Sequence, residues 1–108
     1  MKSEVNLGEF EQIVLLAILR LDPAAYGAAI RHEIESCAHR AVTAGALYTT
    51  LMRLEHKQLV ASTLGDPTPE RGGKAKRFYS VTGAGRTAIT AAQRAYRSLM
   101  NGLELLEH

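Results

Sequence analysis

Four cations lie within seven residues near the middle of the chain, and two glycines lie among them. The segment reads Arg71-Gly72-Gly73-Lys74-Ala75-Lys76-Arg77. Glycine lets a backbone lie close to a ligand and leaves its N–H groups accessible. Guanidinium and ammonium groups neutralise phosphates, which supply most of the affinity of a protein for a nucleic-acid backbone. The segment therefore predicts phosphate contact, and the alternative is a charged loop that only keeps the chain soluble.

A second surface suited to nucleic acid is predicted at residues 43–57. Leu47, Leu51 and Leu54 recur at steps of four and three, which is typical of the buried stripe of a helix, and Thr43 is a suitable N-cap. On a helical wheel the opposite face carries small or polar side chains, with an aromatic residue and a cation on its two flanks. That outward face comprises Gly45, Thr49, Met52 and His56, flanked by Tyr48 and Arg53.

These outward residues have the chemistry of a groove-binding helix. Thr49 can hydrogen-bond a base edge or a phosphate, and Arg53 can bind a phosphate or the O6 and N7 atoms of guanine. The first helical turn, from Thr43 through Ala44 and Gly45, offers N–H groups and a positive dipole end to a phosphate. Taken alone, the pattern fits an ordinary amphipathic helix equally well.

The sequence lacks the residue sets that catalysis or metal binding would need. No Ser/His/Asp set or carboxylate pair stands out, so the sequence predicts no enzyme and no cofactor. Cys37 and His39, with His32 nearby, provide two or three ligands at most, whereas structural zinc needs about four, and no metal site is predicted. Cys37 continues an apolar stripe and is expected to be buried. Phe78 and Tyr79 alternate on a predicted strand, so one is expected in the core, which argues against binding of single strands.

Hydrophobic periodicity and turn residues predict the elements that carry these surfaces. Helices are expected at about 7–20, with Asn6 as N-cap, then at 24–37 and 43–57. Strands are expected at 59–64 and 77–81, and a final helix follows the N-cap Thr82. The fold class is therefore mainly α with a small β-hairpin, in the order α-α-α-β-β-α, which is the layout of a winged helix-turn-helix.

The final helix carries an apolar seam with spacings of 3-4-3-4-3, which indicates packing along a second helix. The seam comprises Ile89, Ala92, Tyr96, Leu99, Leu103 and Leu106. We expect residues 1–81 to form the DNA-binding domain and residues 82–108 to form a C-terminal dimerisation helix. The predicted assembly is a homodimer.

Composition and charge are consistent with a small nucleic-acid binder. The 108 residues carry a net charge of +2, but residues 41–86 alone carry +4, with seven Lys/Arg against three Asp/Glu. A localised basic region is typical of proteins that bind nucleic acid. The sequence contains one cysteine, lacks a signal-peptide pattern, and has no apolar run long enough to span a membrane, so a cytoplasmic location is expected.

The two surfaces resemble motifs of the PadR family of bacterial transcriptional regulators. The likeness covers about residues 7–103 and is carried by three stretches. They are Gly45 to Val60, the hairpin from Gly65 to Tyr79, and Val81-Thr82-Gly83-Ala84-Gly85. Two positions depart from the family pattern, since Ala44 replaces a frequent proline and Ala28 a frequent aromatic residue.

The resemblance implies a repressor that binds an inverted repeat of double-stranded DNA as a homodimer. The family's recognition-helix Tyr and basic residue fall on Tyr48 and Arg53, its basic wing on 71–77, and its pairing helix on 82–106, of the short, single-helix type. Small-molecule effector pockets in relatives are sometimes lined by Trp, which this chain lacks, so no particular effector is implied. The alternative is a winged-helix module for protein–protein contact without DNA binding.

Overall fold

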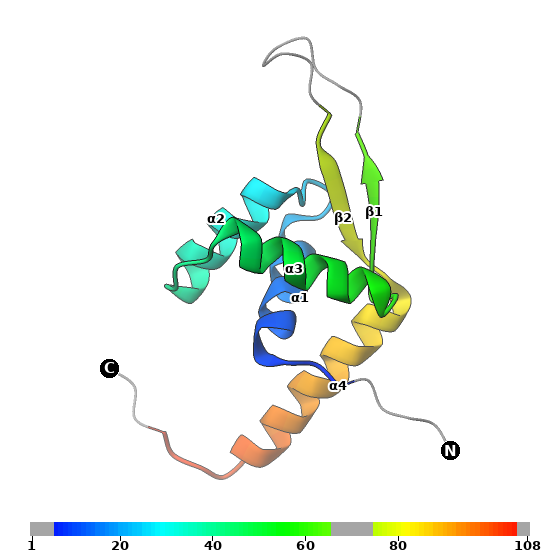
Figure 1. Ribbon diagram of the computed structural model, residues 1–108. Helices are drawn as coiled ribbons and strands as arrows, with labels where there is room; N and C mark the ends of the chain where they lie inside the picture. Colours follow the sequence, from blue (N-terminus) through cyan, green and yellow to red (C-terminus); the bar gives the residue numbers. More distant parts are fainter. Residues whose placement is uncertain (1–5, 66–74, 106–108) are drawn as a thin grey trace.

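The computed structural model describes residues 6–65 and 75–105, and in them the predicted order of elements is confirmed (Figure 1). The helices are α1 (Glu9–Leu21), α2 (Gly27–Ala38), α3 (Ala44–His56) and α4 (Gly83–Met100), and the strands are β1 (Val60–Leu64) and β2 (Arg77–Val81). The first three helices pack together. The antiparallel hairpin β1–β2 extends from them in one direction and α4 in another.

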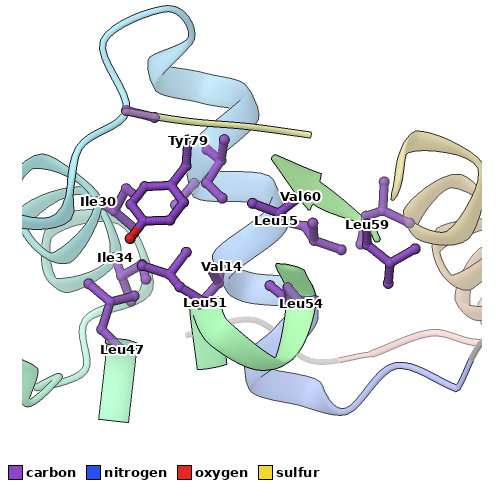
Figure 2. Packing of buried hydrophobic residues seen from close by; sticks show 14 of the residues in the cluster. Val14, Leu15, Ile30, Ile34, Leu47, Leu51, Leu54, Leu59, Val60 and Tyr79 are labelled. Carbon is purple, nitrogen blue, oxygen red and sulfur yellow. The ribbon is translucent and has the colours of Figure 1, made fainter. Parts of the chain in front are cut away.

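One hydrophobic core joins the three helices, the hairpin and the first half of α4, as Figure 2 shows in part. The predicted stripe Leu47, Leu51 and Leu54 is buried and faces side chains of α1 and α2. Of the two adjacent aromatic residues on β2, Tyr79 is in the core and Phe78 is only partly buried, as alternation along a strand requires. The inward face of α3 is thereby fixed, and so is its outward face.

Two hydroxyl side chains start helices where the sequence predicts. The Thr43 side chain accepts a hydrogen bond from the Ala46 N–H at 3.1 Å, and the Thr82 side chain accepts one from the Gly85 N–H at 3.0 Å. The prediction for α1 was wrong, because its N-cap is Gly8 instead of Asn6. The Glu11 carboxylate reaches back to the Gly8 N–H at 2.8 Å and sets the start of the helix.

The start of α2 was also predicted too early. Residues 24–26 are not helical, because Ala25 and Tyr26 pair with β2. The Tyr79 N–H donates to the Ala25 carbonyl at 2.8 Å, and Tyr26 forms an antiparallel bridge with Phe78. The segment that leads into α2 therefore borders β2 through an isolated bridge.

Two further expectations are corrected. Cys37 is exposed, because it lies on the last turn of α2, where its thiol is 3.4 Å from a carboxylate oxygen of Glu33. The final helix ends at Met100 instead of continuing to residue 106. Asn101 leaves the helical conformation and Gly102 has a φ of 85°, a left-handed value that favours glycine and stops a helix.

An ion pair links the beginning of α1 to the end of α3. The Lys57 ammonium group lies 2.9 and 3.1 Å from the two carboxylate oxygens of Glu11, and the Glu11 side chain is only 7% exposed. Burial alone would raise the pKa of Glu11, but hydrogen bonds from the Gly8 N–H and from Lys57 outweigh it and lower that pKa below the ordinary 4.5.

We expect this ion pair to make stability depend on acid pH. Since the folded-state pKa of Glu11 is lowered, its contribution is complete above the unfolded-state value and is lost as the pH falls through the folded-state value. Glu11→Gln should lower the free energy of unfolding at pH 7 by about 1–2 kcal/mol. Urea unfolding at pH 7 and pH 3 measures both effects. An unchanged difference between variant and wild type at the two pH values would contradict the assignment.

Candidate nucleic-acid interface

The outward face of α3 is open to solvent. Gly45, Thr49 and His56 are exposed, and Met52 is 71% exposed. Thr43, Ala44 and Gly45 are exposed at the start of the helix, so its positive dipole end faces solvent. A glycine, a hydroxyl group and an uncovered helix N-terminus together let a polyanion approach the backbone closely.

Tyr48 lies on the flank of this face that adjoins α2. Its side chain packs on the backbone of Gly27, where a Cβ would collide with the phenol hydroxyl, while the residue as a whole remains 47% exposed. Gly27 thus holds Tyr48 in place while part of the ring stays accessible. This role could not be predicted from the sequence, because periodicity does not show which residue of α2 meets α3.

Arg53 lies on the opposite flank, as the helical wheel predicts. It is exposed, and its charge is near enough to Glu11 of α1 to help lower the pKa of that carboxyl group. The α3 face therefore presents part of an aromatic ring along one edge and a guanidinium along the other.

The end of the hairpin strands next to the loop supplies two more exposed cations. The Lys76 ammonium group lies 4.1 Å from the centre of the Tyr26 ring, within the range of a cation–π contact. The Arg77 guanidinium donates to the Ser62 hydroxyl on β1 at 3.0 Å. The other predicted wing residues, Arg71, Gly72, Gly73 and Lys74, lie outside the described residues, and their contact with phosphate stays a prediction.

One buried side chain lies between the hairpin and α3. Burial raises the pKa of Tyr79, the neighbouring Tyr48 adds to this effect, and Arg77 opposes it. The phenol of Tyr79 therefore lies close to residues of both candidate surfaces. The hairpin and α3 are neighbours in space.

The predicted seam on α4 is only partly available to a partner. Ile89 is 4% exposed and belongs to the core of its own chain, and Ala92 is half-buried. Tyr96 and Leu99 are 52% and 77% exposed on the outer half of the helix. Leu103 is exposed but lies beyond the end of the helix, and Leu106 lies outside the described residues.

Two residues that the heptad spacing omitted extend the exposed apolar surface. Met100 and Leu105 are 49% and 60% exposed. We name this surface the C-terminal patch, and it comprises Tyr96, Leu99, Met100, Leu103 and Leu105. Met100 lies four residues after Tyr96, a spacing that puts both on one helix face, so the sequence did contain a signal for it.

Within residues 6–65 and 75–105, no three His, Cys, Asp or Glu side chains are grouped so that they could hold a metal ion. No helix in the same ranges is long and apolar enough to cross a membrane. What the described part of the chain does present is an exposed α3 face, the hairpin cations Lys76 and Arg77, and the C-terminal patch.

Three helices, a hairpin that leaves the end of the third, and an exposed face on that third helix define a winged helix-turn-helix protein. Residues 15–91 match the transcriptional regulator PadR-like family. The chain belongs to this family and is a transcription regulator rather than an enzyme.

Similarity to individual proteins agrees with this family assignment. The chain is 38% identical over 80 residues to the transcriptional regulator Rv3488 of Mycobacterium tuberculosis, covering 72% of this chain and 68% of that protein. It superimposes with a TM-score of 0.70 on RosR of H. salinarum, at 25% identity, over 92% of this chain and 82% of that one. A PadR family regulator of Eggerthella lenta gives a TM-score of 0.66 at 25% identity, over 87% and 81% of the two chains.

Proposed function

We propose that the protein is a repressor that binds an inverted repeat of double-stranded DNA as a homodimer. The observation that carries the proposal is the exposed outward face of α3 together with the exposed cations Lys76 and Arg77 on the hairpin that follows it. A helix of this size fits the major groove, and a basic wing beside it can contact the adjacent backbone. Because such a regulator acts on the chromosome, the proposal includes a cytoplasmic location.

In this proposal the residues have separate roles. Phosphate contacts come from the start of α3 and from the wing, at Thr43, Ala44, Gly45, Arg71, Gly72, Gly73, Lys74, Lys76 and Arg77. Base edges are read from α3 by Thr49 and Arg53, and Tyr48 contacts the backbone. Residues 1–81 form the DNA-binding part, and residues 82–108 join the subunits.

We expect Arg53→Ala to weaken binding to duplex DNA from the protein's own promoter region by about 1–3 kcal/mol, roughly 5- to 150-fold. The reason is the loss of a phosphate or guanine contact. For the wild type, log K should fall linearly and steeply with log salt concentration, by about 0.9 per phosphate neutralised. Fluorescence anisotropy across a salt series measures both.

Arg94→Ala is the matched control, since it removes the same charge from α4, which extends away from α3 and the hairpin. Its affinity should stay close to that of the wild type. Wild-type protein that binds no duplex, or binds it without salt dependence, would remove the proposal. Recovery of a protein partner without DNA would favour the alternative module for protein–protein contact.

The C-terminal patch supports the homodimer. The exposed side chains of Tyr96, Leu99 and Met100 on the outer half of α4 lose contact with water when two copies pair. Light scattering at micromolar concentration should give about twice the chain mass of 11.8 kDa. Leu99→Asp should shift this toward one chain mass without unfolding the protomer, because Leu99 is 77% exposed. A wild-type monomer would refute the dimer, and with it half-sites about one helical turn apart.

A further inference from the structure

A chain of hydrogen bonds runs from α3 across β1 to β2. The Ser62 hydroxyl donates to a carboxylate oxygen of Glu55 at 2.8 Å, and the Arg77 guanidinium donates to the Ser62 oxygen at 3.0 Å. Glu55 belongs to α3, Ser62 to β1 and Arg77 to β2. These three side chains therefore link the third helix to both strands of the hairpin.

The hairpin is held on its other side as well. Lys76, next to Arg77 in an extended segment, lies over the ring of Tyr26, and Tyr26 in turn meets Phe78 edge to face at 5.7 Å between ring centres. Neighbouring residues of an extended chain point in opposite directions. Lys76 thus contacts the segment that leads into α2, and Arg77 is linked to α3 through Ser62. The two contacts add to the core packing of the hairpin on the helices.

Glu55 is negatively charged, whereas the neighbouring side chains proposed to contact DNA are neutral or positive. It is an exposed carboxylate beside residues proposed to contact phosphates, and on charge alone it would weaken the binding of a polyanion. Through Ser62, however, Glu55 can also hold the Arg77 guanidinium in place. A guanidinium has a planar array of donors, and holding that array in place before DNA arrives reduces the ordering that binding requires.

We propose that Glu55, acting through Ser62, is a positioning residue that orients Arg77 and the hairpin for DNA. This inference rests on the proposed function and deepens it. The loss of Glu55 should then weaken specific binding, although it makes the surface more positive. Charge repulsion alone predicts the opposite sign.

The test compares Glu55→Ala and Glu55→Gln with the wild type on two probes of equal length. One is a duplex selected by the purified protein from a random pool, and the other is an unrelated duplex. Glu55→Ala should weaken binding to the selected duplex about fivefold while leaving unrelated binding equal or tighter. Glu55→Gln keeps an oxygen that accepts from Ser62 and should retain near wild-type selectivity. Ser62→Ala should behave like Glu55→Ala.

A double-mutant cycle tests whether Glu55 acts through Arg77. Arg77→Ala should weaken binding, and adding Glu55→Ala to it should cause no further loss. Additive losses, or tighter binding of Glu55→Ala to both duplexes, would overturn the proposal. So would a loss of selectivity in Glu55→Gln equal to that in Glu55→Ala.

A measurement without DNA separates this inference from the proposed function. In Glu55→Ala, amide hydrogens of 60–64 and 77–81 should exchange faster while those of α1 keep their protection. Unchanged exchange in the hairpin would overturn the positioning role even if the wild type binds DNA. Faster exchange in a protein that binds no duplex would support the hydrogen-bond chain and remove the proposed function.

Discussion

Leu54→Ala is expected to lower the free energy of unfolding by about 2–5 kcal/mol, which is a large part of the 5–15 kcal/mol of a typical small domain. Leu54 is fully buried on the inward face of α3 (Figure 2). The truncation removes apolar contact and leaves a cavity that the packed helices close only in part. Urea unfolding followed by circular dichroism measures the loss.

Met52→Ala is the matched control for this prediction. It lies on the same helix, two residues earlier, and is 71% exposed. Its free energy of unfolding should change by no more than about 0.5 kcal/mol. Equal losses in the two variants would mean that the inward and outward faces of α3 are assigned wrongly.

Gly85→Ala is expected to lower the free energy of unfolding by about 3 kcal/mol. A Cβ at Gly85 would collide with the carbonyl oxygen of Leu59 and with a methyl group of Val81. The first of these atoms is backbone and cannot rotate away, so α4 must shift as a whole. Thermal unfolding should show a lower melting temperature for this variant.

Gly83→Ala controls for the effect of alanine itself. A Cβ at Gly83 meets nothing within 4 Å, and alanine favours helix over glycine by up to about 1 kcal/mol. The two variants should therefore change stability in opposite directions. A stabilised Gly85→Ala would disprove the close contact between α4 and the end of α3.

The order of elements could be predicted from sequence because each signal is local. The leucine stripe of α3 and the capping hydroxyls Thr43 and Thr82 need no knowledge of distant residues. The start of α2 could not be predicted in this way. Ala25 and Tyr26 are extended because they pair with β2, more than fifty residues further along the chain.

The end of α4 was mispredicted for another reason. The spacing that includes Leu103 continues a heptad pattern, but Asn101 and Gly102 carry a helix stop signal, and the stop signal prevails. The burial of Cys37 was mispredicted because a stripe of apolar residues does not show where the covering helices end.

The candidate interface was predictable only as two separate surfaces. The wheel gives the outward face of α3, and composition gives the cationic hairpin. The contacts that relate them join residues far apart in sequence, as in the approach of Tyr48 to Gly27 and of Glu55 to Ser62 and Arg77. No periodic pattern contains such contacts, because they depend on how the elements pack.

The position of the Leu59 carbonyl group bears on the spacing between the half-sites of the proposed operator. This carbonyl group accepts the Thr82 N–H at 3.0 Å and lies directly against Gly85, so α4 starts from a fixed point just after the third helix. In the proposed homodimer, joined at the C-terminal ends of its chains, the direction in which α4 leaves this point determines the distance between the two α3 helices. The contact between Leu59 and Gly85 would then help to set the number of base pairs between the two arms of a palindrome, although Gly85 is not among the proposed DNA contacts.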